Sequence, residues 1–345
     1  MKLSDFDFDT PEHLIAQHPL PEREQSRLMV VWRGERRWEH RLFHELPEIL
    51  TAEHLLVMNN SRVFPARLRV HRPGMRESIE VLLVRETEKG QWMALVKPAR
   101  KAPLGQLLEA AELKARVAGV SGQGCRILAF EGNPDIVQVA ETIGEPPLPP
   151  YIRRPDQSCR TEDMERYQTI YAKRTGSIAA PTAGLHFTPQ LLERLNVRGI
   201  ARCEILLHVG YGTFQPIRAS EIGDHRMLPE YFEVSEEAAI LIRAMKASGR
   251  RLIAVGTTTT RVLEYLARDG DLPAQGTSGM CDLFIYPGFN FRVLDGLLTN
   301  FHLPKSTPFL LVCAFAGREL MLECYKEARD RGYRFYSYGD AMLIV

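Results

Sequence analysis

The chain has 345 residues, enough for two domains, because single hydrophobic cores stop growing near ~250–300 residues. Its 45% hydrophobic and 25% charged residues exclude a disordered chain, and 44 basic against 43 acidic residues exclude nucleic-acid binding driven by net charge alone, although a local basic patch stays possible. The start MKLSDFDFDTPEHL lacks the apolar core of a signal peptide, and the longest apolar run, Pro308–Gly317, is about half of what a membrane span requires, so we expect a cytoplasmic protein without membrane contact.

The N-terminal third changes character along its length. A helix is predicted over Pro11–Ala16 and a buried strand over Leu55–Asn59. Two hairpin signals and one further strand follow: Glu80–Arg85, Trp92–Val96, Leu113–Val120, Cys125–Phe130 and Ile136–Ala140. Strands at this spacing are typical of a small antiparallel barrel or sandwich. The proline-rich segment Pro146–Pro150 then predicts a stiff linker.

From about residue 160 strands and helices alternate, which predicts a mainly parallel sheet covered on its faces by helices. Thr188 and Ser235 are predicted to cap two helices at their N-termini. The remaining predicted elements are strands at Arg251–Gly256, Leu283–Tyr286 and Leu297–Thr299, and helices at Arg261–Arg268, Pro308–Phe315 and Arg318–Asp330. We therefore predict an α/β body of residues 1–62 and 151–345, with a small antiparallel β-barrel of residues 63–150 inserted into it.

The segment LHVGYGTFQP, residues 207–216, leaves a buried strand and enters a turn with two glycines. Glycines at such a place let backbone N–H groups approach a ligand closely. Four residues of this turn are therefore predicted to contact a ligand: Gly210, Tyr211, Gly212 and Thr213.

Two further polar segments also follow predicted strands, where ligands bind in open parallel sheets. In VGTTTTR, the backbone N–H groups and hydroxyls of Gly256, Thr257 and Thr258, with Arg261, would face an anion or a carboxylate. A threonine-rich capping turn is the alternative. In LTNFHLPKST, Asn300, His302 and Lys305 would project at the rim, although a lone histidine is often structural.

Several side chains could exchange protons with a ligand. Glu204 and His208 share one face of a predicted strand, which suits acid/base chemistry but also a structural pair. His186 in PTAGLHFT follows a flexible turn and precedes a helix. Asp340 in YSYGDAMLI is a further candidate, with a structural Asx turn as the alternative.

Arginines gather at both predicted domain junctions. Arg62 and Arg67 lie at the first junction and Arg153 at the second, so they could form a basic strip that contacts an RNA backbone. A solvated charged face is the alternative. The six cysteines form no C-x-x-C pair, so we expect reduced thiols and no metal site.

Taken together, these segments resemble one family, the S-adenosylmethionine:tRNA ribosyltransferase-isomerases of queuosine biosynthesis. The matching stretches run in family order along nearly the whole chain: LIAQHP, SRLMVV, NNSRVFPARL, EVLLVRE, ALVKPARK, GEPPLPPYI, RYQTIYAK, PTAGLHFT, LHVGYGTFQP, VGTTTTRVLE, FIYPG, TNFHLPKST and YSYGDAML. The residues at Tyr211, Gln215 and Cys281 depart from the usual family pattern.

The resemblance implies a reaction in which S-adenosylmethionine is a cosubstrate and ribosyl donor. Its ribosyl part would move to the aminomethyl group of 7-aminomethyl-7-deazaguanine at the wobble position of tRNA. Rearrangement to an epoxycyclopentane would give epoxyqueuosine, with release of adenine and methionine. The resemblance also implies an inserted β-barrel and a monomer.

This chemistry needs a base that removes a proton next to the sulfonium, for which the resemblance makes His186 and His208 the first candidates, and Glu204 and Asp340 the reserve. Tyr211 or Phe187 could stabilise the sulfonium. The segment Gly256–Thr260 with Arg261 could hold the methionine carboxylate, and His302 and Lys305 could contact tRNA or cosubstrate. The alternatives are an S-adenosylmethionine-dependent RNA methyltransferase, whose glycine-rich turn after a first strand we do not find, and a non-catalytic RNA-binding module.

Overall fold

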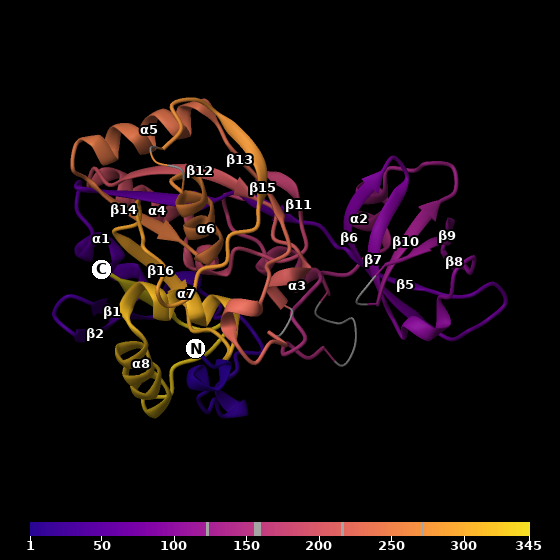
Figure 1. The fold of residues 1–345 in the computed structure, drawn as a ribbon, viewed down its shortest axis with the longest axis horizontal. Helices are drawn as coiled ribbons and strands as arrows, with labels where there is room; N and C mark the ends of the chain where they lie inside the picture. The colour runs from indigo at the N-terminus through magenta and orange to yellow at the C-terminus, as the bar shows by residue number, and fades with distance from the viewer. Residues whose placement is uncertain (122–123, 155–159, 215–216, 269, 271) are drawn as a thin grey trace.

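A nine-stranded sheet forms the centre of the larger part of the molecule (Figure 1). The computed structural model describes the chain except for residues 122–123, 155–159, 215–216, 269 and 271. Within the described residues, the strand order is β15-β13-β12-β3-β14-β16-β17-β1-β2. The strands are β1 Arg27–Trp32, β2 Arg37–Leu42, β3 His54–Asn59, β12 Ala201–Leu207, β13 Glu230–Val234, β14 Arg251–Val255, β15 Thr277–Cys281, β16 Gly296–Asn300 and β17 Ala341–Ile344.

The predicted α/β class is confirmed, and the sheet is mixed. The central strands β12, β3, β14 and β16 run parallel to one another. Outside them, β13 and β15 on one side and β17 on the other are added by antiparallel pairing, and β1 returns parallel to β17. Because the four central strands point the same way, their carboxyl ends meet at one edge of the sheet.

Helices cover both faces of this sheet. Along β3, Leu55 and Val57 pack into the core on one face, and Leu56 and Met58 into the core on the other, since side chains alternate along a strand. The helices of the body are α1 Leu46–Ile49, α3 Arg160–Arg166, α4 Pro189–Val197, α5 Glu236–Ala247, α6 Thr257–Leu266, α7 Thr307–Ala316 and α8 Arg318–Asp330. Helices α5 to α8 contribute to the first core, and α1 and α4 to the second.

Side-chain caps begin the helices where the sequence predicts them. The Thr188 hydroxyl accepts the N–H of Leu191 at the start of α4, and the Ser235 hydroxyl accepts the N–H of Ala238 at the start of α5. Within the described part of the chain, we find no helix with the length and apolar character that crossing a bilayer requires.

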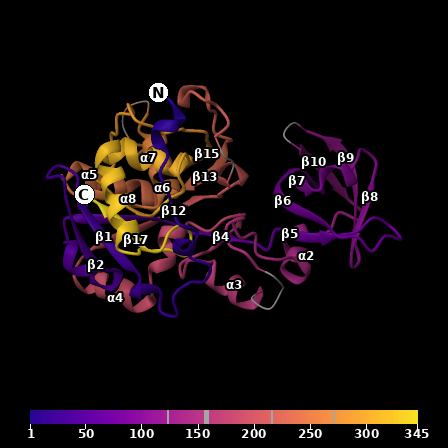
Figure 2. The same ribbon diagram turned by 90° about the horizontal axis from the view of Figure 1, so that it is seen from below.

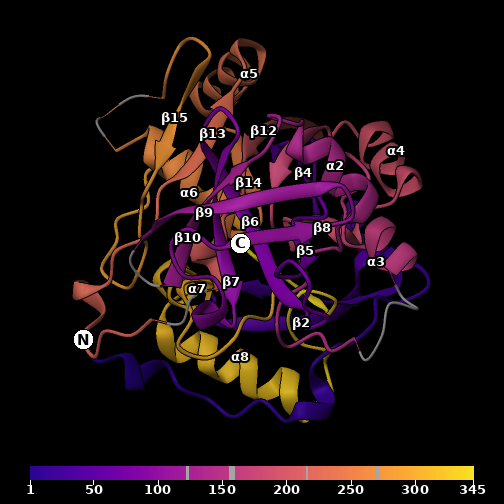
Figure 3. The ribbon, with the colours of Figure 1, turned by 90° about the vertical axis from the view of Figure 1, so that its right-hand side faces the viewer.

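A six-stranded antiparallel sheet curls into an almost closed barrel beside the body (Figures 1 and 2). Its strands are β5 Arg67–Val70, β6 Ile79–Glu88, β7 Gln91–Lys97, β8 Leu107–Ala110, β9 Leu113–Val120 and β10 Cys125–Phe130. The backbones of His71 and Glu109 exchange two hydrogen bonds of 2.8 Å, which join the two ends of the sheet. Seen from the barrel side, these strands lie in front of the body (Figure 3).

The barrel strands all fall within the predicted insertion, whose boundaries stay a prediction. A short parallel pair, β4 Ser61–Val63 and β11 Arg174–Ser177, forms a separate two-stranded sheet. The core of the barrel also includes Ile178, which follows β11.

Two predicted strands and one predicted helix were wrong. Residues 136–140 belong to helix α2, Ile136–Ile143, because Asp135 caps the helix and Ile136 and Ala140, one turn apart, bury the same face. Residues 283–286 form no strand, and the strand lies earlier, at β15. Residues 11–16 hold only a 3-10 turn at Glu12–Leu14.

Candidate active site

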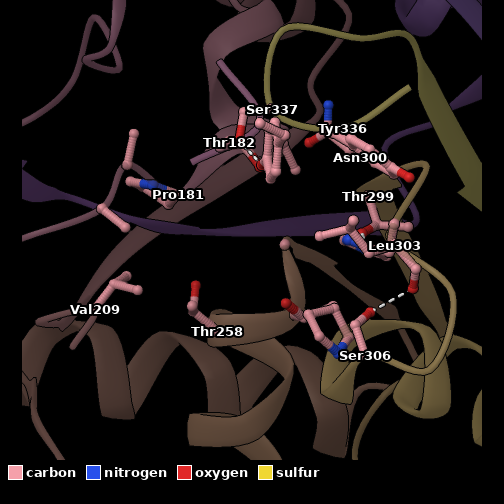
Figure 4. A pocket seen from close by; sticks show the side chains of 18 of the residues that line it. Pro181, Thr182, Val209, Thr258, Thr299, Asn300, Leu303, Ser306, Tyr336 and Ser337 are labelled. Carbon is pink, nitrogen blue, oxygen red and sulfur yellow. Dashed lines mark hydrogen bonds between the residues drawn. The ribbon is translucent and has the colours of Figure 1, made fainter. Parts of the chain in front are cut away.

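A cavity of about 780 Å³ opens at the edge where the central parallel strands end. Its walls include Gly256 after β14. They also include Val209 after β12, Thr299 near the end of β16, and Tyr336 before β17 (Figure 4). The volume lies within the usual range of small-ligand sites. The lining is mainly apolar with a few hydroxyl and amide groups, which is also usual for such sites.

The segment after β14 reaches this cavity through a glycine turn. Gly256 has a φ of 92°, which favours glycine, and helix α6 begins directly after it at Thr257. Gly256, Thr257 and Thr258 all line the cavity. The Asn59 amide, at the end of β3, donates to the Thr258 hydroxyl over 3.4 Å and to the Leu207 carbonyl over 2.9 Å, which ties three strand ends together.

The segment after β16 also lines the cavity, through Asn300, His302 and Lys305. The Nε2 atom of His302 lies 2.7 Å from the Thr299 hydroxyl, and its Nδ1 has no hydrogen-bond partner in the part of the chain that the structure describes. Burial lowers the pKa of His302 to about 3, so the imidazole is neutral. The Lys305 ammonium lies 2.7 Å from the Asp7 carboxylate.

Tyrosines form another part of the wall. Tyr151 and Tyr336 stand with their ring centroids 4.9 Å apart, and the Tyr151 hydroxyl lies 2.6 Å from that of Ser337. Figure 4 shows Tyr336, Ser337 and Asn300 across the cavity from Thr258.

His186 lies behind the cavity wall rather than in it. The Asn300 amide donates to its Nε2 over 3.2 Å, and its Nδ1 lies 2.6 Å from the Ser26 hydroxyl, which donates to the Arg23 carbonyl. This pattern fits an imidazole with its proton on Nδ1. Burial, followed by the charges of Arg334 and Arg23, lowers the pKa of His186 to about 3. His186 can therefore act on the cavity only through Asn300, whose Oδ1 is buried without a partner among the described residues.

Asp340 stabilises a turn. Its carboxylate accepts the backbone N–H groups of Arg27 and Arg334, over 3.1 and 2.8 Å. Burial raises its pKa. Asp340 is not among the described residues that line the cavity.

His208 and Glu204 also lie outside that lining. The Nδ1 atom of His208 is 2.8 Å from the Ser61 hydroxyl, and burial lowers the pKa of His208 to about 4. Glu204 accepts from the Asn60 amide over 3.1 Å and pairs with Lys173 over 2.7 Å. Among the described residues, His208 and Glu204 therefore contact different partners and do not form the predicted acid/base pair.

The glycine turn after β12 contributes Val209 to the cavity. The N–H of Gly210 donates to the Glu230 carboxylate over 2.7 Å, the ring of Tyr211 packs against the barrel core, and Gly212 abuts Leu228. The side chain of Thr213 and all of Gln215 lie outside the described residues.

Arg261 points away from the cavity. Its guanidinium forms a buried ion pair with Glu230 and donates to the carbonyls of Leu283 and Cys281, over 2.9 and 3.2 Å. Of the predicted carboxylate-binding residues, Gly256, Thr257 and Thr258 line the cavity, and Arg261 supports the helix behind them.

The arginines at the junctions have different surroundings. Arg62 is exposed on β4, whereas Arg67 donates to the Leu148 carbonyl over 2.8 Å. Arg153 is exposed and pairs with Glu12 over 2.7 Å. Their contact with RNA stays a prediction.

The described lining residues to which sequence reasoning assigned no role include Tyr151 and Tyr336. Tyr151 follows the prolines that we interpreted only as a linker, and Tyr336 precedes the glycine of YSYGD, where Asp340 drew attention. Phe187, a candidate for contact with a sulfonium, is fully buried against Phe43 and Tyr171.

A second cavity of about 730 Å³ lies at the opposite edge of the sheet. His54 and Arg251, which begin β3 and β14, line it together with Trp32 and Asp295. It shares no described residue with the first cavity.

Comparison with known proteins identifies the family. The family described as "Queuosine biosynthesis protein" matches residues 3–344. Proteins named S-adenosylmethionine:tRNA ribosyltransferase-isomerase are 49% identical over 347 residues in Pelotomaculum thermopropionicum and 48% identical over 349 residues in Desulfitobacterium hafniense. Both alignments cover 100% of each chain.

The fold agrees with a solved structure. The crystal structure of an S-adenosylmethionine tRNA ribosyltransferase from Thermotoga maritima aligns with 99% of this chain and 100% of its own, with a TM-score of 0.56 and 39% sequence identity. These full-length matches show that the chain belongs to the queuosine biosynthesis proteins, as an enzyme of the S-adenosylmethionine:tRNA ribosyltransferase-isomerase family.

Proposed function

We propose that this enzyme transfers the ribosyl part of S-adenosylmethionine to the 7-aminomethyl-7-deazaguanine base of tRNA and isomerises it to epoxyqueuosine, releasing adenine and methionine. The observation that carries the location of this reaction is the cavity of about 780 Å³ at the carboxyl ends of β12, β3, β14 and β16. The names of the full-length relatives support S-adenosylmethionine and tRNA as the two substrates.

In this proposal the methionine carboxylate of the cosubstrate binds at the start of α6. The first N–H groups of a helix have no partner within the helix, and they attract anions together with its dipole. The turn at Gly256 exposes this helix start, and the Thr257 and Thr258 side chains line the same wall. Arg261 keeps α6 in place through Glu230 instead of binding the carboxylate.

We assign proton removal next to the sulfonium to His302 in place of His186 and His208. His302 is the histidine among the described residues that line the cavity, and its Nδ1 is without a partner there. The C5′–H bond breaks, the proton moves to the imidazole, and the electron pair stays on carbon beside the sulfonium. The Thr299 hydroxyl holds the ring in position.

In this proposal the tRNA binds to side chains at the domain junctions, and its modified base enters the cavity from there. Arg62, Arg67 and Arg153 are proposed to contact its phosphates. Arg62 and Arg153 are exposed, so they can do so without loss of packing.

The reaction is tested by incubating the protein with S-adenosylmethionine and tRNA that carries 7-aminomethyl-7-deazaguanine, followed by chromatography of the small products. Adenine and methionine in equal amounts, formed only with the modified base, would support ribosyl transfer. S-adenosylhomocysteine would instead make the protein a methyltransferase, and tRNA binding without any product would leave a binding module.

A further inference from the structure

The cavity contains no acidic side chain that could balance a cationic ligand, as far as the described residues show. Lys305 is the charged residue in the described lining, and Asp7 neutralises it. A cation buried without compensation is costly. If the proposed function holds, the sulfonium of S-adenosylmethionine needs another source of negative potential in this cavity.

Tyr151 and Tyr336 can provide that potential through their ring faces. The ring centroids are 4.9 Å apart and the planes are inclined by 54°, and the hydrogen bond between the hydroxyls of Tyr151 and Ser337 helps to fix one of the rings. Burial raises the pKa of Tyr151 to about 12 and also raises that of Tyr336, so both phenols stay neutral at pH 7. Rings at this inclination do not form the single flat surface on which a base stacks.

The backbone at Tyr336 is held in an unfavourable conformation. Its φ of 70° lies in the left-handed region, which L residues other than Asn and Asp rarely adopt. The N–H of Tyr336 donates to the Phe301 carbonyl over 2.9 Å, and its carbonyl accepts the N–H of Gly339 over 3.0 Å. Backbone strain of this kind is concentrated at ligand sites, and here it turns Tyr336 toward the cavity (Figure 4).

We propose that the rings of Tyr151 and Tyr336 bind the sulfonium of S-adenosylmethionine by cation–π interaction and thereby select the charged cosubstrate over its neutral thioether analogue, S-adenosylhomocysteine. This inference rests on the proposed function. It assigns a selective role to two residues far apart in the chain, one directly after the proline-rich segment and one in the turn before β17.

Isothermal titration calorimetry with each of the two ligands separates charge recognition from general damage to the cavity. We expect the wild-type protein to prefer S-adenosylmethionine. Tyr151→Leu and Tyr336→Leu should each lower the ratio of the two affinities by about tenfold, which corresponds to about 1.4 kcal/mol. Tyr151→Phe and Tyr336→Phe keep the ring and should keep the ratio. Leucine at 336 carries the same backbone strain as tyrosine, so strain relief does not enter the comparison.

The matched control is Tyr265→Leu, on α6, because the Tyr265 ring packs against Phe232 and Arg268 and is not in the described lining. It should leave the ratio unchanged. Equal losses of both affinities in the two leucine variants would overturn the inference alone. A wild-type protein that binds neither ligand would overturn the proposed function as well.

Discussion

Burial decides what each histidine of this enzyme can do. His186 and His302 both have a pKa lowered to about 3, yet the lone pair of His186 Nε2 is occupied by Asn300, whereas Nδ1 of His302 has no partner among the described residues. Both imidazoles are therefore neutral, but they differ in whether a ring nitrogen can reach a ligand in the cavity. Of these two histidines, His302 is the one that lines the cavity, so the proposed proton transfer is assigned to it.

Replacement of this histidine should therefore affect the chemical step. His302→Gln keeps a polar side chain next to Thr299 but removes the imidazole, and we expect kcat to fall at least about 100-fold, the usual contribution of a positioned base, with a small change in KM for S-adenosylmethionine. Steady-state adenine release measures both constants. His54→Gln, at the second cavity, is the control and should keep full turnover. Near-normal kcat in His302→Gln would refute the assignment.

The buried ion pair of Glu230 and Arg261 should matter for stability. Glu230→Gln leaves the Arg261 guanidinium buried without its counter-charge and should lower the free energy of unfolding by about 3–5 kcal/mol. Urea denaturation measures the loss. Glu233→Gln, on the same strand, breaks a half-exposed pair with Arg174 and should cost less than about 1 kcal/mol. Similar losses in the two variants would contradict this reading.

At the residue scale, the sequence predicted the segments of the site better than its side chains. Gly256, Thr258 and His302 line the cavity as segments after strands should. The sequence could not exclude Arg261 as a ligand-binding residue, because its ion-pair partner Glu230 lies 31 positions away and on another element. His186 and Asn300 are likewise 114 positions apart.

At the scale of elements, the start of α6 is the most informative junction. β14 ends at Val255, Gly256 turns the chain with positive φ, and α6 begins at Thr257. Gly256 adopts a backbone conformation that L residues avoid, and this conformation turns the N-terminus of α6 toward the cavity.

Gly256→Ala should consequently have two effects. A Cβ at this position would meet Ala183 and Thr258 only at 3.8 Å, so the cost is backbone strain rather than a clash. The φ of 92° and ψ of 156° at Gly256 lie in an extended region that is essentially limited to glycine, where strain costs about 1–3 kcal/mol. We expect that loss of stability together with weaker binding of S-adenosylmethionine, measured by denaturation and calorimetry. Gly249→Ala, with a φ of 76° at the end of α5 and open space around it, should also lose stability through backbone strain but keep its affinity for S-adenosylmethionine. Equal affinities in the two variants would count against a ligand at α6.

Local signals predicted most elements, and tertiary context decided the exceptions. The caps at Thr188 and Ser235 act within three residues, so the sequence predicts α4 and α5 directly. The β-branched residues around Ile136 favour a strand, but packing against the barrel core selects the helix α2. Strand β15 has a glycine and exposed residues, so it gives no periodic signal.

At the scale of the whole molecule, buried neutral histidines link stability to pH. His186 and His302 have a pKa of about 3 and His208 of about 4 in the folded state, against about 6.5 when unfolded. Below pH 6.5 the unfolded chain binds protons that the folded chain does not. The free energy of unfolding should therefore be fully developed above pH 6.5 and fall as the pH falls toward 4 and 3.

Urea denaturation at pH 7.5 and 5.5 tests this linkage. The wild-type protein should be less stable at pH 5.5, and His186→Asn should show a smaller difference between the two pH values, although it is less stable at pH 7.5. His13→Asn removes an exposed histidine and should retain the wild-type difference. If the difference in unfolding free energy between the two pH values were unchanged in His186→Asn, His186 would not contribute to the pH dependence of stability.

The central claim is that S-adenosylmethionine is bound and cleaved at the carboxyl edge of the parallel strands. A crystal structure of the protein with S-adenosylmethionine tests it most directly. We predict the ligand in the cavity of about 780 Å³, with its carboxylate at the start of α6 near Thr257 and its ribose beside His302. A ligand bound instead at the opposite edge of the sheet, in the cavity lined by His54 and Arg251, would contradict the account.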